Sequence, residues 1–220
     1  MIRAVLFDLD GTLADTERLQ WRAYREVLLE QGVDVGMDEY RRHWIAVDGG
    51  PEYACRTYHL PYGAAELRTR KTARYRELIQ GVVPPCAGAV AALQRLRSTH
   101  QLAIATNTVR AELEHILEKL GMQDLLHHTI AREDYGQPKP APDAYLRAAQ
   151  VVGATPDECV VIEDTHRGMR AGLAAGMRVV VVPNDLTFDN DFTGASARLR
   201  SLDELDAPLL AGLTAPRNDS

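Results

Sequence analysis

The feature that most constrains the fold is an alternation of short apolar runs with longer amphipathic stretches beyond residue 83. The runs have the length of strands and are almost wholly apolar, and one more such run opens the chain. Strands that alternate with helices pair in parallel, and helices then cover both faces of the sheet. The sequence therefore predicts an α/β core with a parallel sheet. The expected strands are residues 3–7, 101–106, 128–131, 159–163 and 178–182, and the expected helices are 87–98, 109–120, 141–152 and 166–175.

The segment from residue 16 to residue 82 has a different pattern. It lacks a comparable apolar run and contains several stretches with helical spacing of apolar residues. We therefore expect a helical insertion at 16–82, and a core made of residues 1–15 and 83–220. The expected helices of the insertion are residues 17–31, 38–47, 51–58 and 63–80, and residues 214–220 are expected to form a frayed tail.

Composition excludes several classes of protein. The 220 residues are 45% hydrophobic, which is ample for a core, and the formal charge of −6 gives no general attraction for nucleic acid or anionic membranes. No apolar run approaches the ~20 residues of a membrane helix. The N-terminus does not resemble a signal peptide, and three scattered cysteines indicate a reducing compartment, so we expect a cytoplasmic protein. A monomer and a homodimer are both open.

Polar residues gather where the predicted strands end. Ligands of open parallel sheets bind beyond the carboxyl ends of the strands, so these residues are expected to converge on one edge. They are Asp8 and Asp10 after the first strand, Thr106 and Asn107 after the second, Glu163 and Asp164 after CVVIE, and Lys139 in the loop QPKPAPD before a helix.

Four carboxylates at one edge repel one another and need a cation. Hard oxygen ligands favour Mg²⁺, which keeps some waters and substrate phosphate in its shell. Beside Mg²⁺, one aspartate of the pair Asp8 and Asp10 could attack phosphorus and the other could transfer the proton. Lys139 would offset negative charge, Thr106 would hold phosphate oxygens, and Gly11 would allow close approach of the backbone to the ligand.

Each motif alone also has an ordinary structural explanation. The pair Asp10-Gly11 is a common turn, and Glu163-Asp164 or Thr106-Asn107 could simply cap the helix that follows. A calcium-binding loop starting at Asp8 fails on register, since glycine falls at its fourth position rather than its sixth and Leu19 occupies the twelfth. The ordered occurrence of all the motifs at strand ends favours a functional site.

The stretches FDLDGTLADT, AIATNT, KPAPDAY and VVIEDT with GLAAGM resemble, in order, the four motifs of the haloacid-dehalogenase-like phosphohydrolase family. The resemblance spans essentially the whole chain. It implies a Rossmann-like core and a mobile helical cap at residues 16–82. It also implies that Asp8 is the nucleophile, Asp10 the general acid and base, and Thr106 and Lys139 phosphate-binding groups. Mg²⁺ would then be held by Asp8, the carbonyl of Asp10, and Asp164, with Glu163 assisting.

Within that family the chain resembles the sugar-phosphate branch, which contains β-phosphoglucomutases and xylulose-1,5-bisphosphate phosphatases. The stretches YRRHWIAVDGG, RKTARYRELI and TFDNDFTGASARLRSLDEL are similar to the latter. By that resemblance Glu17 and Lys71 would contact the substrate from the cap. We also expect Asn107 and Gly11 to be substrate-binding residues. For Arg41, Arg42 and Arg68, a second phosphate site and an ordinary arginine surface are the alternatives.

The chain departs from its relatives at three places. Gln20 stands where the mutases use a histidine, Pro51-Glu52-Tyr53 replaces a basic pair after the cap glycines, and Thr165-His166-Arg167 replaces the usual serine and asparagine. The first departure argues against a mutase, and the second leaves recognition of a distal phosphate open. We expect a Mg²⁺-dependent phosphatase that hydrolyses a small sugar phosphate or bisphosphate through an aspartyl-phosphate. A phosphomutase and a non-catalytic regulator that binds a phosphometabolite are the alternatives.

Overall fold

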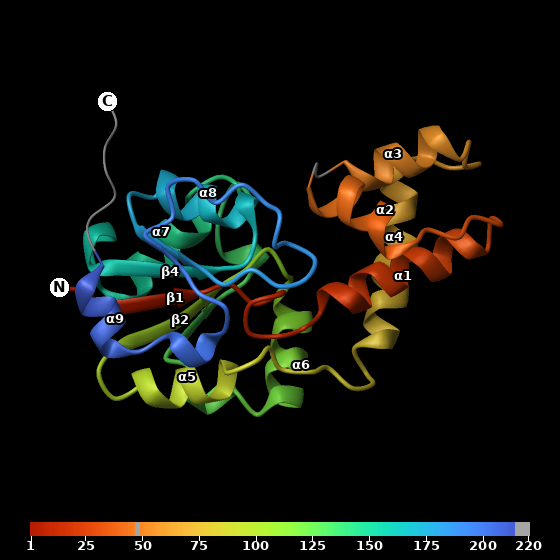
Figure 1. The fold of residues 1–220 in the computed structure, drawn as a ribbon. Coiled ribbons are helices and arrows are strands. Elements are labelled where there is room, and N and C mark those ends of the chain that lie inside the picture. Colours follow the sequence, from red (N-terminus) through yellow and green to blue (C-terminus); the bar gives the residue numbers. More distant parts are fainter. Residues whose placement is uncertain (47–48, 214–220) are drawn as a thin grey trace. The chain divides into compact units, whose positions relative to one another are not determined.

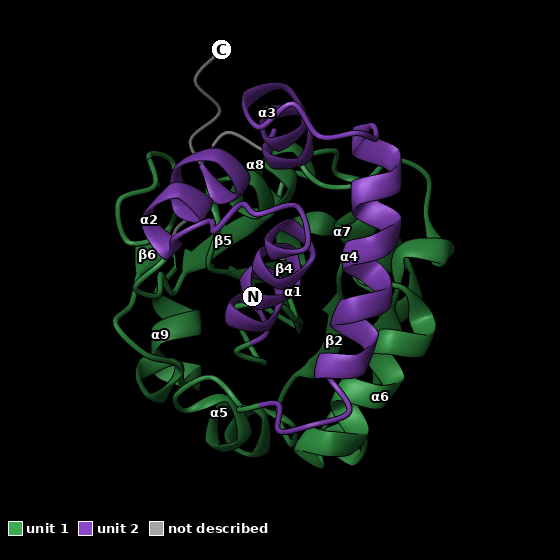
Figure 2. Ribbon diagram, turned by 90° about the vertical axis from the view of Figure 1, so that its right-hand side faces the viewer, with its two compact units in different colours: residues 1–15, 84–220 green, residues 16–83 purple. Residues whose placement is uncertain are grey.

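The computed structural model describes residues 1–46 and 49–213 and divides the chain into two compact units. Unit 1 comprises residues 1–15 and 84–220, and unit 2 comprises residues 16–83 (Figure 2). The sequence suggested boundaries at 15/16 and 82/83. The predicted frayed tail, 214–220, lies outside the described residues. Within the described residues, no helix has the length and apolar character needed to cross a membrane.

Unit 1 is built on a six-stranded sheet in which all paired strands are parallel (Figure 1). Phe7 pairs in register with Ile104 on one side and with Ile162 on the other. The residues that follow these strands therefore leave the sheet at the same edge. The predicted α/β class is confirmed. The strands are β1 (Ala4–Phe7), β2 (Gln101–Ala105), β3 (His128–Ile130), β4 (Cys159–Glu163), β5 (Arg178–Val181) and β6 (Ala197–Arg198), in the order β3-β2-β1-β4-β5-β6.

Helices flank this sheet, and α7 and α8 contact its strands directly: α7 lies against β1, β2 and β3, and α8 against β4 and β5. The helices of unit 1 are α5 (Ala89–Leu96), α6 (Arg110–Leu120), α7 (Asp143–Val152), α8 (His166–Ala174) and α9 (Ala207–Gly212). The helix expected from residue 87 begins only at Ala89, because Gly88 has a left-handed φ of 77°. Neither β6 nor α9 was expected from the sequence.

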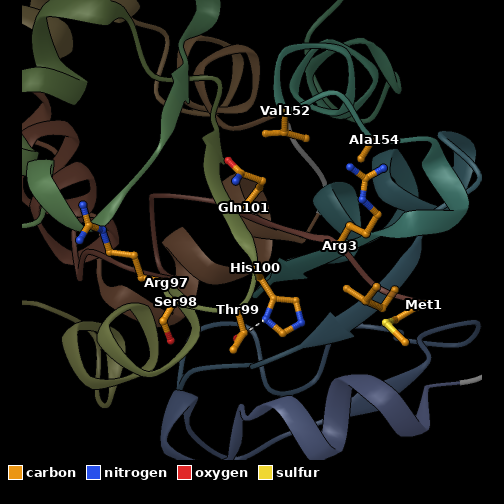
Figure 3. Close-up of a pocket in the computed structure, with 10 residues that line it drawn as sticks. Met1, Arg3, Arg97, Ser98, Thr99, His100, Gln101, Val152 and Ala154 are labelled. Atoms are coloured by element: carbon orange, nitrogen blue, oxygen red, sulfur yellow. Dashed lines mark hydrogen bonds between the residues drawn. The ribbon is translucent and has the colours of Figure 1, made fainter.

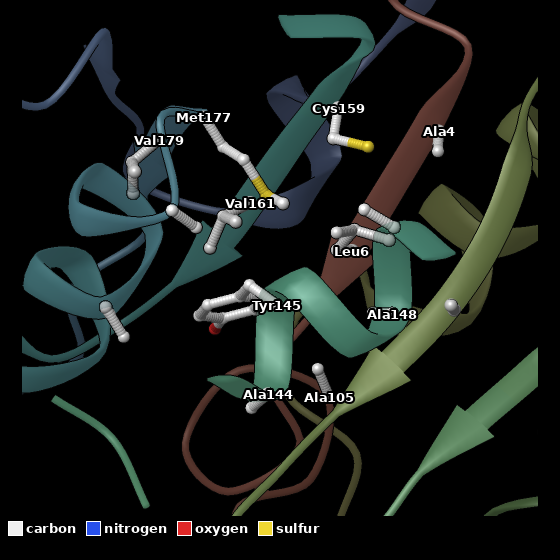
Figure 4. Close-up of a cluster of buried hydrophobic side chains, with 14 of the residues drawn as sticks. Ala4, Leu6, Ala105, Ala144, Tyr145, Ala148, Cys159, Val161, Met177 and Val179 are labelled. Carbon is white, nitrogen blue, oxygen red and sulfur yellow. The ribbon is translucent and has the colours of Figure 1, made fainter. Parts of the chain in front are cut away.

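The layer between the sheet and α7 is rich in alanine (Figure 4). Ala144 and Ala148 of α7 belong to the same buried cluster as Ala103 and Ala105 of β2, and small side chains let a helix approach a sheet closely. Tyr145 of α7 is the largest buried side chain of this cluster and is fully buried. The ring of Tyr145 therefore fills the core, and its hydroxyl is the one polar group that it must satisfy.

Unit 2 is helical, with α1 (Glu17–Leu29) packed on α4 (Ala64–Leu78). The expected helix 38–47 is wrong as a single α-helix, because α2 (Met37–Tyr40) passes into a π-helical turn at Arg41–Ile45; residue 47 lies outside the described residues. In that turn the Trp44 ring stacks on Tyr40, with 5.5 Å between centroids. The chain continues into α3 (Gly50–Thr57).

Candidate active site

The predicted edge of the sheet carries a buried charged cluster. Asp8 directly follows β1, Glu163 is the last residue of β4, and Lys139 lies in the loop before α7. The ammonium of Lys139 donates to Asp8 Oδ1 at 2.5 Å, to Glu163 Oε1 at 2.8 Å and to the hydroxyl of Tyr145 at 2.8 Å. A lysine has three N–H donors, so these partners use all of them. The structure thus brings together residues that the sequence separates by more than a hundred positions.

Three carboxylates of this cluster are close enough to share a cation. One oxygen each from Asp8, Glu163 and Asp164 lies within 4.8 Å of the others, and all three residues are buried. With Lys139, the ionised cluster carries two net negative charges. Burial raises the pKa of Asp8 to about 8, and Glu163 and Asp10 add to the shift while Lys139 opposes it. A divalent cation with a preference for oxygen ligands, such as Mg²⁺, fits both the charge and the donors.

The Glu163 carboxylate is engaged by five hydrogen bonds. Its Oε1 accepts from Lys139 and from the Tyr145 hydroxyl, and its Oε2 accepts from the backbone N–H of Asp164 and from both the N–H and the hydroxyl of Thr165. Burial alone would raise the pKa of Glu163, but Lys139 and these donors hold it below its usual value. A Cβ on Gly168 would lie 1.8 Å from Glu163 Oε1. The Glu163 carboxylate is thus held in one position, and any residue other than glycine at 168 would overlap it.

Asp10 has partners of its own. Its Oδ2 accepts from the hydroxyl of Thr108 at 2.5 Å and from that of Thr106 at 3.4 Å. Both threonines come from the segment after β2, so the side chain of Asp10 faces the predicted phosphate-binding residues. The metal contact through the Asp10 main-chain carbonyl stays a prediction.

Tyr135 contacts the predicted phosphate-binding residues beside this cluster. The Tyr135 hydroxyl lies 2.8 Å from the Thr106 carbonyl oxygen and 2.7 Å from Asn107 Oδ1, which also accepts from the backbone N–H of Lys139 at 3.1 Å. These two bonds orient the Asn107 amide with its oxygen toward Tyr135 and Lys139, and substrate binding by Asn107 stays a prediction. Burial raises the pKa of Tyr135 to about 12, so its hydroxyl remains protonated.

Gly11 is needed for the position of Asp164. It has a left-handed φ of 82°, and a Cβ there would lie 2.2 Å from Asp164 Oδ2. The close approach at Gly11 is therefore to a carboxylate of the cluster. The same Asp164 oxygen accepts from Asn184 Nδ2 at 2.9 Å.

The predicted cap residues have contacts within unit 2. The Tyr40 hydroxyl donates to Glu17, and Lys71 donates to Gln20 and lies 4.8 Å from the centroid of the Tyr75 ring. Gln20 is thus engaged with the lysine that was expected to contact the substrate. The substrate contacts of Glu17 and Lys71 stay predictions.

The arginines considered for a second phosphate also have partners inside unit 2. Arg68 binds both carboxylate oxygens of Glu52, at 2.6 and 2.8 Å, and Arg42 donates to the Asp38 carbonyl oxygen at 3.2 Å. Arg41 is engaged as well. The Arg68 guanidinium is therefore paired with Glu52, and both side chains are about half-exposed.

A cavity of about 320 Å³ lies elsewhere in unit 1, beside the amino ends of β1 and β2 (Figure 3). Arg3, His100 and Gln101 are among the residues that line it. It contains none of the cluster residues, so it is separate from the candidate active site.

Sequence reasoning missed Thr108, Tyr135, Tyr145 and Asn184 as members of the site. Two signals were present, since Tyr145 belongs to the KPAPDAY motif and Asn184 follows an apolar strand at the same edge of the sheet. A third signal was the second threonine of the stretch TNT, which is Thr108.

Comparisons with known proteins agree with this geometry. A family model described as haloacid dehalogenase-like hydrolase matches residues 2–176. The chain belongs to the haloacid dehalogenase-like hydrolase family. This confirms the family and the enzyme class inferred from the motifs.

Relatives in this hydrolase family include named phosphatases. Protein CbbY of Rhodobacter capsulatus is 34% identical over 213 residues, which cover 91% of this chain and 94% of that protein. Fructose-1-phosphate phosphatase YqaB of Escherichia coli is 31% identical over 182 residues, covering 81% of this chain and 95% of the relative. A crystal structure of CbbY from Rhodobacter sphaeroides in complex with xylulose-(1,5)bisphosphate superposes with a TM-score of 0.78 at 32% identity, covering 93% of this chain and 96% of the other.

Proposed function

We propose that this hydrolase is a Mg²⁺-dependent phosphatase that cleaves a small sugar phosphate or bisphosphate through an aspartyl-phosphate on Asp8. The observation that carries the proposal is the buried cluster in which Asp8 contacts Lys139, with Glu163 and Asp164 beside it. The cluster combines Asp8 as the nucleophile, the ammonium of Lys139 beside it, and an excess of negative charge that suits a divalent ion. Bound Mg²⁺ would neutralise the carboxylates and the phosphoryl oxygens.

Asp8 and Asp10 would divide the reaction between them. A carboxylate oxygen of Asp8 forms a bond to phosphorus as the ester P–O bond breaks, and Asp10 gives its proton to the departing oxygen. Asp10 then takes a proton from water as the water oxygen attacks phosphorus, which frees Asp8 and inorganic phosphate. The two threonine hydroxyls on Asp10 Oδ2 hold that carboxyl group in a defined orientation for both transfers.

Lys139, Thr106 and Asn107 would hold the phosphoryl group. Lys139 is fixed beside Asp8, so its charge lies where negative charge develops at phosphorus. The Asn107 amide, held through its oxygen, presents its two Nδ2 donors to phosphate oxygens. A Cβ on Gly11 would overlap Asp164, so this glycine leaves room for that carboxylate, and the predicted close approach of its backbone to the substrate stays part of the proposal.

The substrate class is inferred from the relatives. One is named for fructose 1-phosphate and another was crystallised with xylulose-(1,5)bisphosphate, and both compounds are phosphorylated ketoses. We therefore propose phosphorylated ketoses as the first class to test. Glu17 and Lys71 are the proposed cap contacts.

The test is phosphate release by the purified chain from a panel of sugar phosphates and bisphosphates, with and without Mg²⁺. Asp8→Asn should lower kcat by several orders of magnitude and keep the fold, because the amide is a poor nucleophile. Asp157→Asn, at an exposed carboxylate before β4, is the matched control and should retain activity. Near-wild-type turnover by Asp8→Asn would refute the proposal. Isomerisation of β-glucose 1-phosphate without phosphate release would instead support the mutase alternative.

A further inference from the structure

Asn184 lies in the loop after β5, at the same edge of the sheet as the carboxylate cluster. Its Nδ2 donates to Asp164 Oδ2 at 2.9 Å and to the Gly11 carbonyl oxygen at 3.4 Å. The amide nitrogen of Asn184 thus contacts both a carboxylate of the cluster and the backbone at Gly11. None of the four sequence motifs that resemble the hydrolase family contains Asn184.

The orientation of the Asn184 amide is fixed by its own loop. Its Oδ1 accepts from the backbone N–H of Leu186 at 2.8 Å, and its backbone N–H donates to the hydroxyl of Thr187 at 3.0 Å. Thr187 is buried. Because the amide oxygen is held by a backbone donor, the nitrogen must face Asp164.

Asp164 is therefore held from two sides. Asn184 binds Oδ2, and the Thr12 hydroxyl lies 3.5 Å from Oδ1, while the absence of a side chain at Gly11 leaves open the space that Oδ2 occupies. An amide donor is neutral, so it orients the carboxylate without cancelling its charge. A lysine or arginine at this position would instead compete with a bound cation.

We propose that Asn184 is a positioning residue that fixes the Asp164 carboxylate and thereby sets the affinity of the cluster for Mg²⁺. The inference rests on the proposed function only in the identity of the ion. Groups that orient metal ligands typically change metal affinity about 10–100-fold when they are removed. Asn184 acts through Asp164 and need not touch the substrate.

The experiment measures Mg²⁺ binding to the full chain by calorimetry, without substrate. Asn184→Ala removes the amide, and Asn184→Ser keeps a short side-chain acceptor for the Leu186 N–H, which preserves the turn, but lacks the amide Nδ2 that reaches Asp164. Asn190→Ala is the matched control, because this amide lies in the same loop and its oxygen accepts only the His166 backbone N–H among the contacts described.

We expect the Mg²⁺ dissociation constant to rise about 10–100-fold in both Asn184 variants and to stay within about twofold in the control. At saturating Mg²⁺, kcat should stay within a few-fold of wild type, whereas a general loss of structure would lower kcat at every Mg²⁺ concentration. Unchanged Mg²⁺ affinity in folded Asn184→Ser would overturn the proposal. If the wild-type chain binds Mg²⁺ but hydrolyses no phosphoester, the proposed function fails and the comparison of affinities still tests Asn184.

Discussion

Replacing Tyr145 by phenylalanine isolates one hydroxyl of the candidate site. This hydroxyl accepts from Lys139 and donates to Glu163, both at 2.8 Å, and the residue is fully buried. Burial and the nearby carboxylates raise the pKa of Tyr145 well above its usual value, so the hydroxyl is protonated and can donate. Phenylalanine keeps the ring and its packing against the alanines of α7 and the sheet.

The magnitude follows from the two lost hydrogen bonds. Each joins the hydroxyl to a charged group, and such a bond contributes about 1.5–3 kcal/mol. Lys139 keeps Asp8 and Glu163 as partners, and Glu163 keeps Lys139, so we expect a total loss of about 2–4 kcal/mol rather than the full sum. For a chain of this size that corresponds to a Tm lower by about 5–15 °C.

The effect on catalysis should appear in kcat. With one N–H of Lys139 unpaired, the ammonium is less well fixed beside Asp8, and we expect kcat to fall roughly tenfold, equivalent to about 1.4 kcal/mol of the barrier. Mg²⁺ affinity should fall as well, because the Tyr145 hydroxyl donates to Glu163, one of the three carboxylates that could share the cation. Steady-state phosphate release and Mg²⁺ calorimetry separate the two effects.

Tyr62→Phe is the control, since the Tyr62 hydroxyl is buried and makes no hydrogen bond to the described residues. Its removal should leave the free energy of unfolding unchanged or slightly increased. Wild-type Tm and kcat in Tyr145→Phe would refute the reasoning that this hydroxyl holds Lys139 and Glu163.

Two further predictions concern the same cluster. Gly168→Ala should abolish most activity and lower the free energy of unfolding by about 1–3 kcal/mol, because its Cβ would overlap the Glu163 carboxylate. Gly212→Ala is the control, because a Cβ there meets open space and the substitution should be neutral by thermal unfolding. Full activity in Gly168→Ala would contradict the conclusion that Glu163 is held in one position. Because the pKa of Asp8 is raised to about 8, the metal-free site holds a proton below that pH which Mg²⁺ must displace. Mg²⁺ affinity should therefore increase from pH 6 toward pH 8, by up to about tenfold per pH unit, with proton release seen by calorimetry in two buffers, and a flat profile would contradict the shift.

The sequence was sufficient to predict the edge at which the cluster forms. The apolar runs marked where β1, β2 and β4 end, and parallel pairing then brought their following residues to one edge. The convergence of Asp8, Thr106 and Glu163 needed no knowledge of side-chain contacts. The parallel strand order is therefore enough to predict that the residues after β1, β2 and β4 lie at one edge of the sheet.

The supporting hydrogen bonds could not be predicted in this way. Whether Tyr145 reaches Glu163 depends on how closely α7 packs on the sheet, and whether Asn184 reaches Asp164 depends on the turn made by Leu186 and Thr187. Both are properties of three-dimensional packing. The short strand β6 was missed for a related reason, because Ala197–Arg198 contains no apolar run.

The alanine layer under α7 links the mutational tolerance of the core to that of the reaction centre. Enlarging Ala144, Ala148 or Ala103 would push the helix outward and carry the Tyr145 hydroxyl away from its two charged partners. A library that randomises this layer should therefore yield many variants that fold and few that turn over substrate. We therefore expect enlarged side chains in this alanine layer to lower activity, as substitutions of Asp8 and Asp10 should.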